Sequence, residues 1–259
     1  MKKEISILGC GWLGEPLARK LIESGYAIKG STTTATKINR LSSLGIKAFL
    51  IDLGKLNNSV ADFLDAEVLI IAIPSKNIDG FRKLILQIEK SRVQNIIFIS
   101  STSVYENSND IVTEDSLVKQ TSLIEIENLF QNNRHFKTNI IRFAGLMGYD
   151  RQPGNFFPVG KKIPNPEGFV NMIHRDDCIR IISMMIKEDL WGETINACAD
   201  THPSRREFYT KAAIELGKDT PKFEESDLNE FKIISNQKLK SLFGYQFKYS
   251  DIFNINEKI

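Results

Sequence analysis

The sequence has few cysteines, and those it has are scattered. Cys10, Cys178 and Cys198 are its three cysteines, and none belongs to a C-x-x-C pair. This spacing argues against a disulfide framework and against a zinc site. We therefore expect three small buried side chains in a reducing cytoplasm, and no metal.

Long apolar segments and an excess of one charge are also missing. The longest apolar runs, such as 68–73, are far too short to span a bilayer, and residues 1–4 lead into a strand pattern without the apolar region and cleavage site of a signal peptide. The formal net charge is only +2 at pH 7, which gives no reason to expect nucleic acid as a partner. We expect a cytoplasmic protein with no membrane and no nucleic-acid partner, which acts on a small molecule.

A glycine-rich turn near the start is the strongest signal present. An apolar run, 5–8, is followed by G-x-G-x-x-G, formed by Gly9, Gly11 and Gly14, and then by leucines at helical spacing. Strand, glycine turn and helix in this order form the dinucleotide-binding fingerprint: one glycine for the tight turn, one for the approach of the pyrophosphate and one for close packing of helix and strand. The amide groups of the turn and the positive end of the helix dipole then face the phosphates. The alternative is a glycine turn that merely joins two packed elements.

The segment that follows the second predicted strand bears on the choice of cofactor. In NAD-binding proteins of this type an acidic residue about 20 residues beyond the glycines holds the ribose 2′-OH. None stands in 30–34, and hydroxyl side chains are there instead, at Ser31, Thr32 and Thr33. Because Lys37 and Arg40 follow, and a 2′-phosphate suits donors and cations, NADP is slightly favoured over NAD. An ordinary polar loop that caps the next helix explains the segment about equally well.

Short apolar runs alternate with amphipathic segments up to residue 143. Strands are predicted at 5–8, 26–29, 47–51, 68–73, 95–99 and 138–143, and helices in the segment that follows Gly14, at 78–90 and at 116–130. The alternation predicts an α/β protein with a doubly wound parallel Rossmann sheet, whose ligands lie outside the carboxyl ends of the strands.

The pattern changes after about Ala144. Glycines and prolines punctuate 144–168, and beyond them helices are predicted at 177–187, 204–216 and 236–243 and a strand at 194–197. The 259 residues, 42% of them hydrophobic, suffice for one large domain and a smaller lobe. We predict a dinucleotide-binding domain over 1–150 and a smaller C-terminal substrate lobe over 151–259, partly interleaved with the main domain.

Five separated segments together resemble one family. They are 9–14, 52–53, 100–105, 142–148 and 171–177, and in this order they are similar to the extended short-chain dehydrogenase/reductases, especially the NAD-dependent epimerase/dehydratase branch. The resemblance covers nearly the whole chain.

The resemblance implies a cofactor site. Asp52 and Leu53 would border the adenine, and Ala72, Ile73 and Pro74 would line the ribose and nicotinamide side. The predicted site further includes two residues of the glycine turn and one at the end of the fifth strand, namely Trp12, Leu13 and Ser100.

The resemblance also implies one catalytic side chain. Ser101 would face the substrate and hydrogen-bond the reacting oxygen. The alternative is that 100–103 is a polar strand end that caps its own backbone. His174 is interpreted as a packed histidine, and Asp176 and Asp177 as caps of the following helix, because no further ligand spacing supports a metal.

The chain departs from the family at the proton relay, Y-x-x-x-K, in which tyrosine is the general acid and base and lysine lowers its pKa. The tyrosines stand at 26, 105, 149, 209, 245 and 249, and none has lysine four positions later. On the predicted helix 116–130, Lys119 falls near the place of the tyrosine and Leu123 near that of the lysine. Since an unperturbed tyrosine has a pKa of about 10 and is a poor base near pH 7, the remaining candidates are Tyr105, Lys119 and the substrate itself.

Three hypotheses remain. The leading one is an NAD(P)-binding oxidoreductase or nucleotide-sugar epimerase/dehydratase-like protein without the usual relay, acting on a nucleotide sugar or a carbonyl compound. The second is a non-catalytic dinucleotide-binding regulatory or redox-sensing protein. The third is a different Rossmann dehydrogenase, which 11–14 and 72–74 suggest. The oligomeric state stays open, with a homodimer among the options.

Overall fold

The computed structural model describes residues 3–56, 58–158, 160–225 and 230–255. Its helices are α1 (Gly14–Glu23), α2 (Ile38–Ser43), α3 (Ser59–Leu64), α4 (Ile78–Ile88), α5 (Ser122–Gln131), α6 (Arg175–Glu188), α7 (Arg205–Glu215) and α8 (Gln237–Phe243). Its strands are β1 (Glu4–Leu8), β2 (Ala27–Thr32), β3 (Lys47–Leu50), β4 (Val68–Ile71), β5 (Asn95–Ser101), β6 (Ile111–Val112), β7 (Lys137–Phe143), β8 (Gly145–Met147), β9 (Met172–His174), β10 (Thr194–Ala197) and β11 (Ile233–Ile234).

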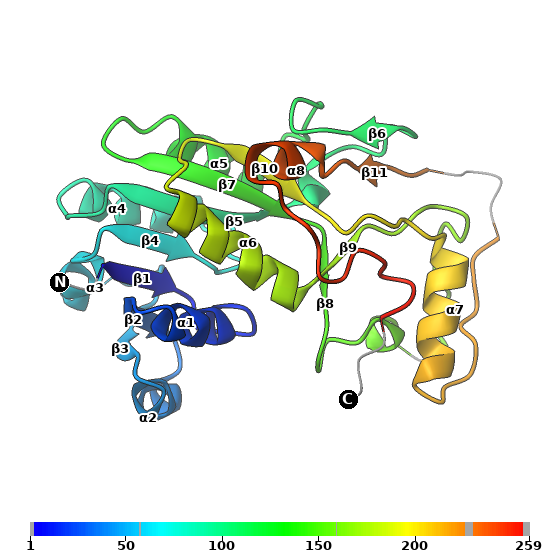
Figure 1. The fold of residues 1–259 in the computed structure, drawn as a ribbon, viewed down its shortest axis with the longest axis horizontal. Coiled ribbons are helices and arrows are strands. Elements are labelled where there is room, and N and C mark those ends of the chain that lie inside the picture. The colour runs from blue at the N-terminus through cyan, green and yellow to red at the C-terminus, as the bar shows by residue number, and fades with distance from the viewer. Residues whose placement is uncertain (1–2, 57, 159, 226–229, 256–259) are drawn as a thin grey trace. The chain divides into compact units, whose positions relative to one another are not determined.

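Seven strands form the central sheet, in the order β10-β7-β5-β4-β1-β2-β3 (Figure 1). β1 pairs in parallel with β2 and with β4, and the pairs β2–β3 and β4–β5 are parallel as well. The chain thus builds the sheet outward from β1 in one direction and from β4 in the other. The predicted doubly wound α/β Rossmann fold is confirmed. A reversal of this kind leaves a crevice at the carboxyl ends of β1 and β4, where ligands of such sheets bind.

The chain divides into two compact units that alternate along the sequence. Unit 1 consists of residues 1–100, 120–141 and 179–194, and unit 2 of residues 101–119, 142–178 and 195–259. Residues 101–119 and 142–150, which the sequence-based division assigned to the dinucleotide-binding domain, fall in unit 2.

Unit 1 has an apolar core on one face of the sheet. β4 is fully buried, as its unbroken apolar run predicts for an inner parallel strand. One cluster joins strand residues to α3, α4 and α5 and includes Leu8, Leu69, Phe98, Phe63, Phe81 and Phe130. The Phe81 ring lies edge-on to the rings of Phe98 and Phe130, a favourable geometry for aromatic pairs. This packing fixes the strand ends from which a ligand site can be built.

Unit 2 contains two small parallel pairs, β8–β9 and β6–β11, and helix α7. Its core gathers Met147, Met172, Phe208 and Ile252. Helix α7 begins in a capping box: the Ser204 hydroxyl accepts from the Glu207 amide, and the Glu207 carboxylate accepts from the Ser204 amide.

Two of the predicted elements differ from the structure at the places that matter most for function. β2 continues to Thr32, so Ser31 and Thr32 end a strand instead of forming a loop. The helix predicted over 116–130 begins only at Ser122, because extended Thr121 caps it by accepting from the Ile124 amide. Lys119 therefore lies before the helix and not on it. Among the described residues, no helix is both long and apolar enough to cross a membrane.

Candidate functional site

The three glycines of the turn differ in what the fold demands of them. Gly9 has φ +103°, and a Cβ there would lie 2.5 Å from the Ile73 side chain and 2.8 Å from the Ala72 carbonyl oxygen. A Cβ on Gly14 would overlap the Gly9 carbonyl oxygen. A Cβ on Gly11 would meet no atom within 4 Å. Packing of the protein itself therefore requires Gly9 and Gly14, whereas the space in front of Gly11 is open.

Gly11 is exposed and lines a cavity of about 400 Å³ in unit 1, at the carboxyl ends of β1, β2 and β4. Its lining residues are Leu8, Gly9, Cys10, Gly11, Ser31, Thr32, Thr33, Thr34, Lys37, Ile51, Asp52, Leu53, Ala72, Ile73, Pro74 and Ser75. Most of the residues that the sequence predicts for the cofactor site thus share one cavity, although they come from four separate segments. A cavity at this place in a doubly wound sheet is where a dinucleotide binds.

Four of the predicted cofactor residues do not line this cavity: Trp12, Leu13, Gly14 and Ser100. Leu13 and Gly14 are buried at the start of α1. Ser100 and Glu127 are 6% and 1% exposed, and the Ser100 hydroxyl donates to the Glu127 carboxylate on α5. This hydroxyl is therefore engaged inside unit 1, and no motif in the sequence pairs it with Glu127.

Some polar groups near the β2 end of the cavity are hydrogen-bonded or paired within the protein, and others are open to a ligand. The Ser31 hydroxyl accepts from the Gly9 amide at 3.0 Å and so holds the glycine turn. The Arg40 guanidinium pairs with Glu15 at 2.6 Å and does not line the cavity. Lys37 lines the cavity, is exposed, and forms no ion pair with any described residue. Lys37 is thus the cation available to a phosphate there.

The cysteine in the cavity is unreactive. Burial, together with the Glu15 charge, raises the pKa of the Cys10 thiol to about 12. Burial also raises the pKa of Cys178 and of Cys198, and all three are free thiols. Because the thiolate is the reactive form, redox sensing through any of these cysteines has no chemical support.

In unit 2, the segment after β5 carries the predicted catalytic serine. Ser101 ends the strand, and its hydroxyl accepts from the Ser103 amide at 3.1 Å, where the short 3₁₀ helix Thr102–Val104 begins. This is the backbone-capping role expected for a polar strand end. The hydroxyl keeps its own proton for donation to a further acceptor.

Tyr105, one candidate for the missing proton relay, is a structural residue. It is 0% exposed; its hydroxyl donates to the Asn196 side chain at 2.9 Å and accepts from Arg142 at 2.7 Å. Burial is the largest effect on its pKa, which is raised. A buried phenol with both hydrogen-bonding positions occupied and a raised pKa cannot act as a base near neutral pH.

Two lysines lie against the backbone of the same segment. The Lys119 amide donates to the Val104 carbonyl at 2.8 Å, and its ammonium is 3.6 Å from the Glu106 carboxylate. The Lys232 ammonium donates to the Tyr105 carbonyl at 2.6 Å. No motif predicts this contact of Lys232, which lies 127 residues from its partner.

Asp176 and Asp177 lie in the first turn of α6, and their carboxylates bind the C-terminal segment, a role that differs from the helix caps expected from the sequence. The Asp177 carboxylate accepts from the Tyr245 hydroxyl at 2.6 Å and from the amides of Lys248 and Tyr249 at 2.8 and 2.9 Å. The Asp176 carboxylate accepts from the Lys248 ammonium at 2.8 Å. These acids hold the C-terminal segment, and among the described residues no three or more His, Cys, Asp or Glu are grouped as a metal site would need.

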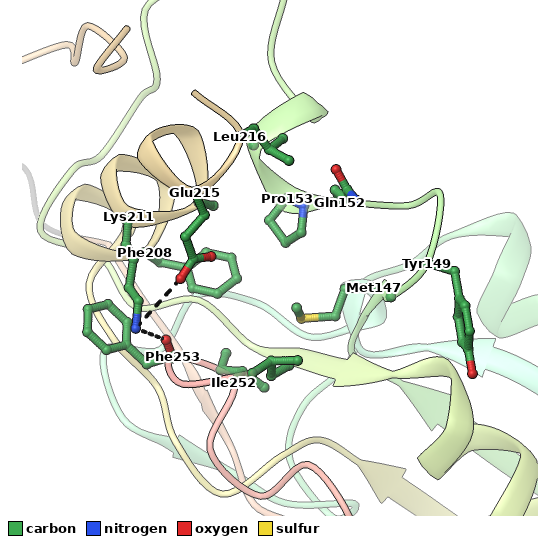
Figure 2. A pocket seen from close by; sticks show the side chains of 14 residues that line it. Met147, Tyr149, Gln152, Pro153, Phe208, Lys211, Glu215, Leu216, Ile252 and Phe253 are labelled. Atoms are coloured by element: carbon green, nitrogen blue, oxygen red, sulfur yellow. Dashed lines mark hydrogen bonds and ion pairs between the residues drawn. The ribbon is translucent and has the colours of Figure 1, made fainter. Parts of the chain in front are cut away.

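A second cavity, about 340 Å³, lies in unit 2 beside α7 (Figure 2). Phe208, Leu216 and Ile252 contribute apolar surface. The Lys211 ammonium on its wall donates to the Phe253 carbonyl and, at 2.8 Å, to the Asn254 side chain. Lys211 is thereby tied to the C-terminal segment.

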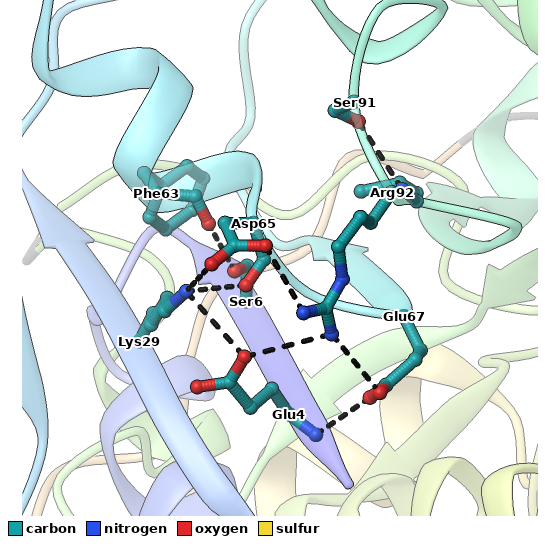
Figure 3. A network of polar contacts seen from close by, with 9 residues as sticks. Glu4, Ser6, Lys29, Phe63, Asp65, Glu67, Ser91 and Arg92 are labelled. Atoms are coloured by element: carbon teal, nitrogen blue, oxygen red, sulfur yellow. Dashed lines mark hydrogen bonds and ion pairs between the residues drawn. The ribbon is translucent and has the colours of Figure 1, made fainter.

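A network of charged side chains in unit 1 lies where β1 and β4 begin (Figure 3). The Lys29 ammonium, with 6% side-chain exposure, is 3.7 Å from Glu4 and 3.6 Å from Asp65. Arg92 reaches the same two carboxylates and Glu67. This network ties strand starts together and is far from the carboxyl edge at which ligands of such sheets bind.

Comparison with known proteins agrees with this picture. Residues 4–124 match the NAD binding domain of 6-phosphogluconate dehydrogenase. Protein YeeZ of Escherichia coli strain K12 is 32% identical over 267 residues, which cover 96% of this chain and 97% of that protein.

Two solved structures share the fold over nearly the whole chain. A conserved protein of unknown function from Silicibacter pomeroyi has a TM-score of 0.80 at 20% identity, covering 97% of this chain and 96% of its own. UDP-glucuronic acid 4-epimerase from Bacillus cereus, in complex with UDP-glucuronic acid and NAD, has a TM-score of 0.76 at 21% identity, covering 95% and 94%.

The sheet, the glycine turn and these likenesses define the class as a Rossmann-fold protein whose residues 4–124 match an NAD binding domain, and whose fold is shared with UDP-glucuronic acid 4-epimerase. Within that class, the chain belongs to the family of Protein YeeZ.

Proposed function

We propose that this chain is a cytoplasmic NAD(P)-dependent oxidoreductase or epimerase-like enzyme that holds its dinucleotide in the cavity of unit 1. The observation that carries the proposal is the open space at Gly11. Gly9 and Gly14 are explained by the packing of the protein, but nothing in the protein within 4 Å would oppose a side chain at Gly11. A pyrophosphate that approaches the backbone there accounts for the open space.

The residues around the cavity fit an NADP or NAD molecule. The glycine turn and the start of α1 would hold the pyrophosphate, Asp52 and Leu53 would border the adenine, and 72–74 would line the nicotinamide side. Lys37 and Thr33 would hold a 2′-phosphate, so we propose a preference for NADP(H). When bound, the nicotinamide ring supplies hydride chemistry.

The proposed substrate is a nucleotide sugar or a carbonyl compound. Support comes from the Bacillus cereus epimerase of the same fold, which binds UDP-glucuronic acid together with NAD. In this chain we place the substrate with unit 2 and assign Ser101 to hydrogen-bond its reacting oxygen. The roles of 72–74 and of Ser101 are carried over from the family resemblance.

Titration calorimetry with NADPH and NADH tests the cofactor proposal. We expect both to bind and NADPH to bind more tightly. Gly11→Asp should weaken binding, whereas Asn39→Asp adds the same charge on α2 at a position that does not line the cavity and should leave it nearly unchanged. Absence of binding to the wild-type protein, or equal loss in both variants, would refute the proposed site.

A non-catalytic dinucleotide-binding regulator is the alternative function. The buried position of Tyr105 favours this alternative over an enzyme of the same fold that uses a tyrosine as its acid and base. The two functions differ in turnover. Reduced cofactor mixed with a panel of carbonyl compounds and nucleotide sugars, followed by nicotinamide absorbance, should show oxidation with at least one compound. Tight cofactor binding with no turnover on the panel would favour the regulator.

A further inference from the structure

The cavity of about 340 Å³ beside α7 has no part in the proposed cofactor site (Figure 2). Its walls come from three stretches that are far apart in the sequence, namely 147–154, 208–216 and 252–255. All three stretches belong to unit 2, so the cavity is complete within one compact unit. Its volume lies in the range of cavities that hold small organic molecules.

The wall formed by 147–154 is held in place by the fold itself. Tyr149 has φ +56°, in the left-handed region that a bulky residue seldom adopts. Two residues that do not line the cavity hold it there: its hydroxyl donates to the Asp176 carboxylate at 2.8 Å, and the Arg175 guanidinium lies 3.7 Å from the centre of its ring. Gly148 and Arg151 exchange backbone hydrogen bonds of 3.1 and 3.0 Å. Strained backbone that the surrounding structure holds in this way is concentrated at ligand and functional sites.

Helix α7 packs closely against the other end of the same stretch. A Cβ on Gly154 would overlap the Ala212 carbonyl oxygen, so backbone packing sets the spacing of these two walls. Met147, Phe208 and Ile252 are buried and surround one space in Figure 2. The interior of the cavity is therefore apolar, and its shape does not depend on a ligand.

The charged groups of the cavity compensate each other. Lys211 and Glu215 are one turn apart on α7, with the ammonium 3.9 Å from the carboxylate, and no other lining residue carries a charged side chain. The Lys211 ammonium also donates to the Phe253 carbonyl and, at 2.8 Å, to the Asn254 side chain. A charged ligand would thus gain little net Coulomb attraction for the hydration that it loses. The cavity favours an uncharged ligand.

Gln152 is the polar lining residue that is left for such a ligand. Its carboxamide forms no hydrogen bond with another residue in the part of the chain that the structure describes. A carboxamide offers two donor protons and one acceptor oxygen. It can therefore pair with a second amide through one N–H···O bond in each direction.

We propose that the unit 2 cavity binds an uncharged organic molecule with an apolar body and a carboxamide or lactam group, and that Gln152 hydrogen-bonds this group. The apolar body would lie against Met147, Phe208 and Ile252. No residue lines both this cavity and the cavity assigned to the dinucleotide. The inference therefore does not depend on cofactor binding.

Three probes of nearly equal size test the ligand class: 3-phenylpropionamide, 3-phenylpropionate and 3-phenylpropylamine, which are neutral, anionic and cationic at neutral pH. The full chain is labelled with ¹³C at the methionine methyl groups, and the Met147 signal, assigned with Met147→Leu, is followed by NMR during each titration. We expect the amide to shift this signal with a Kd on the order of 1 mM. The two charged probes should bind at least about fivefold more weakly. A preference for either charged probe, or no shift of Met147 with the amide, would overturn the proposal.

Two variants locate the binding. Gln152→Met removes the carboxamide at nearly constant length and should weaken the amide probe by about fivefold, the loss of one neutral hydrogen bond. Gln87→Met makes the same change at an exposed position of α4 in unit 1 and should leave the Kd unchanged. Ala212→Leu enlarges a side chain that lines the cavity and should abolish binding, while a thermal melt shows that each variant is folded. An unchanged Kd in Gln152→Met would reject the role of Gln152, and an unchanged Kd in folded Ala212→Leu would reject the cavity as the binding site.

Discussion

Gly11→Asp is the sharpest test of the cofactor site, because the protein itself gives no reason for glycine at this position. A Cβ on Gly11 would meet no atom within 4 Å, and its φ is not in the left-handed region. We therefore expect the variant to fold, with a melting temperature within a few degrees of the wild type. The new carboxylate would lie in the cavity where the pyrophosphate is proposed to bind.

The size of the effect follows from the charges. Two unit charges about 5 Å apart at an effective dielectric constant of about 20 repel by roughly 3 kcal/mol. Solvent in an open cavity reduces this figure, so we expect an affinity loss of at least tenfold, about 1.4 kcal/mol or more. Calorimetric titration with NADPH and a thermal melt of the same sample measure the two quantities. An unchanged Kd in a folded Gly11→Asp protein would refute the reasoning and move the dinucleotide site elsewhere.

The same structure supports three further predictions. Gly14→Ala should lower stability by about 1–3 kcal/mol in denaturant unfolding, because its Cβ would overlap the Gly9 carbonyl oxygen; a wild-type midpoint would contradict this packing. Lys37→Gln should weaken NADPH binding by about fivefold and NADH binding much less. Arg40→Gln should have a smaller effect on NADPH binding, because the Arg40 charge is paired with Glu15. Equal effects of Lys37→Gln on the two cofactors would argue against a 2′-phosphate contact. The third prediction concerns the pH dependence of stability. In the folded protein the pKa of Lys232 is about 8, below its value of about 10.4 in the unfolded chain. Between these pH values the unfolded state binds more protons, so the free energy of unfolding should rise with pH. Urea unfolding at pH 8 and pH 10 should show this rise in the wild type and a smaller one in Lys232→Met.

The sheet was predictable because its signals are local. An apolar strand, three glycines and a helix with leucines at helical spacing follow one another directly in the sequence. The apolar run 68–71 by itself indicates an inner parallel strand, whatever the other segments do. The short elements were missed for the opposite reason: β6, β8, β9 and β11 have two or three residues each, too few to show a period. The helix start at Ser122 was misplaced because Thr121 acts as a cap, and several hydroxyl residues near it were equally able to do so.

The candidate site divides in the same way. Residues that a motif places at strand ends, such as Gly9, Asp52 and Ala72, were predictable and line one cavity. The partner that each polar side chain takes was not predictable. The Ser100 hydroxyl donates to Glu127 and the Arg40 guanidinium pairs with Glu15, and no sequence spacing indicates either contact.

The missing relay shows most clearly why sequence reasoning ends where it does. A relay of the form Y-x-x-x-K is readable because both groups lie on one helix turn, and a search for its substitute naturally stays on that helix. In this chain the segment that should begin the helix is extended, which removes Lys119 from the helix and sets it beside residues 104–106. Residues 116–119 belong to unit 2 together with Lys232, which reaches the Tyr105 carbonyl across 127 residues. A contact of this range has no local spacing from which the sequence could have indicated it.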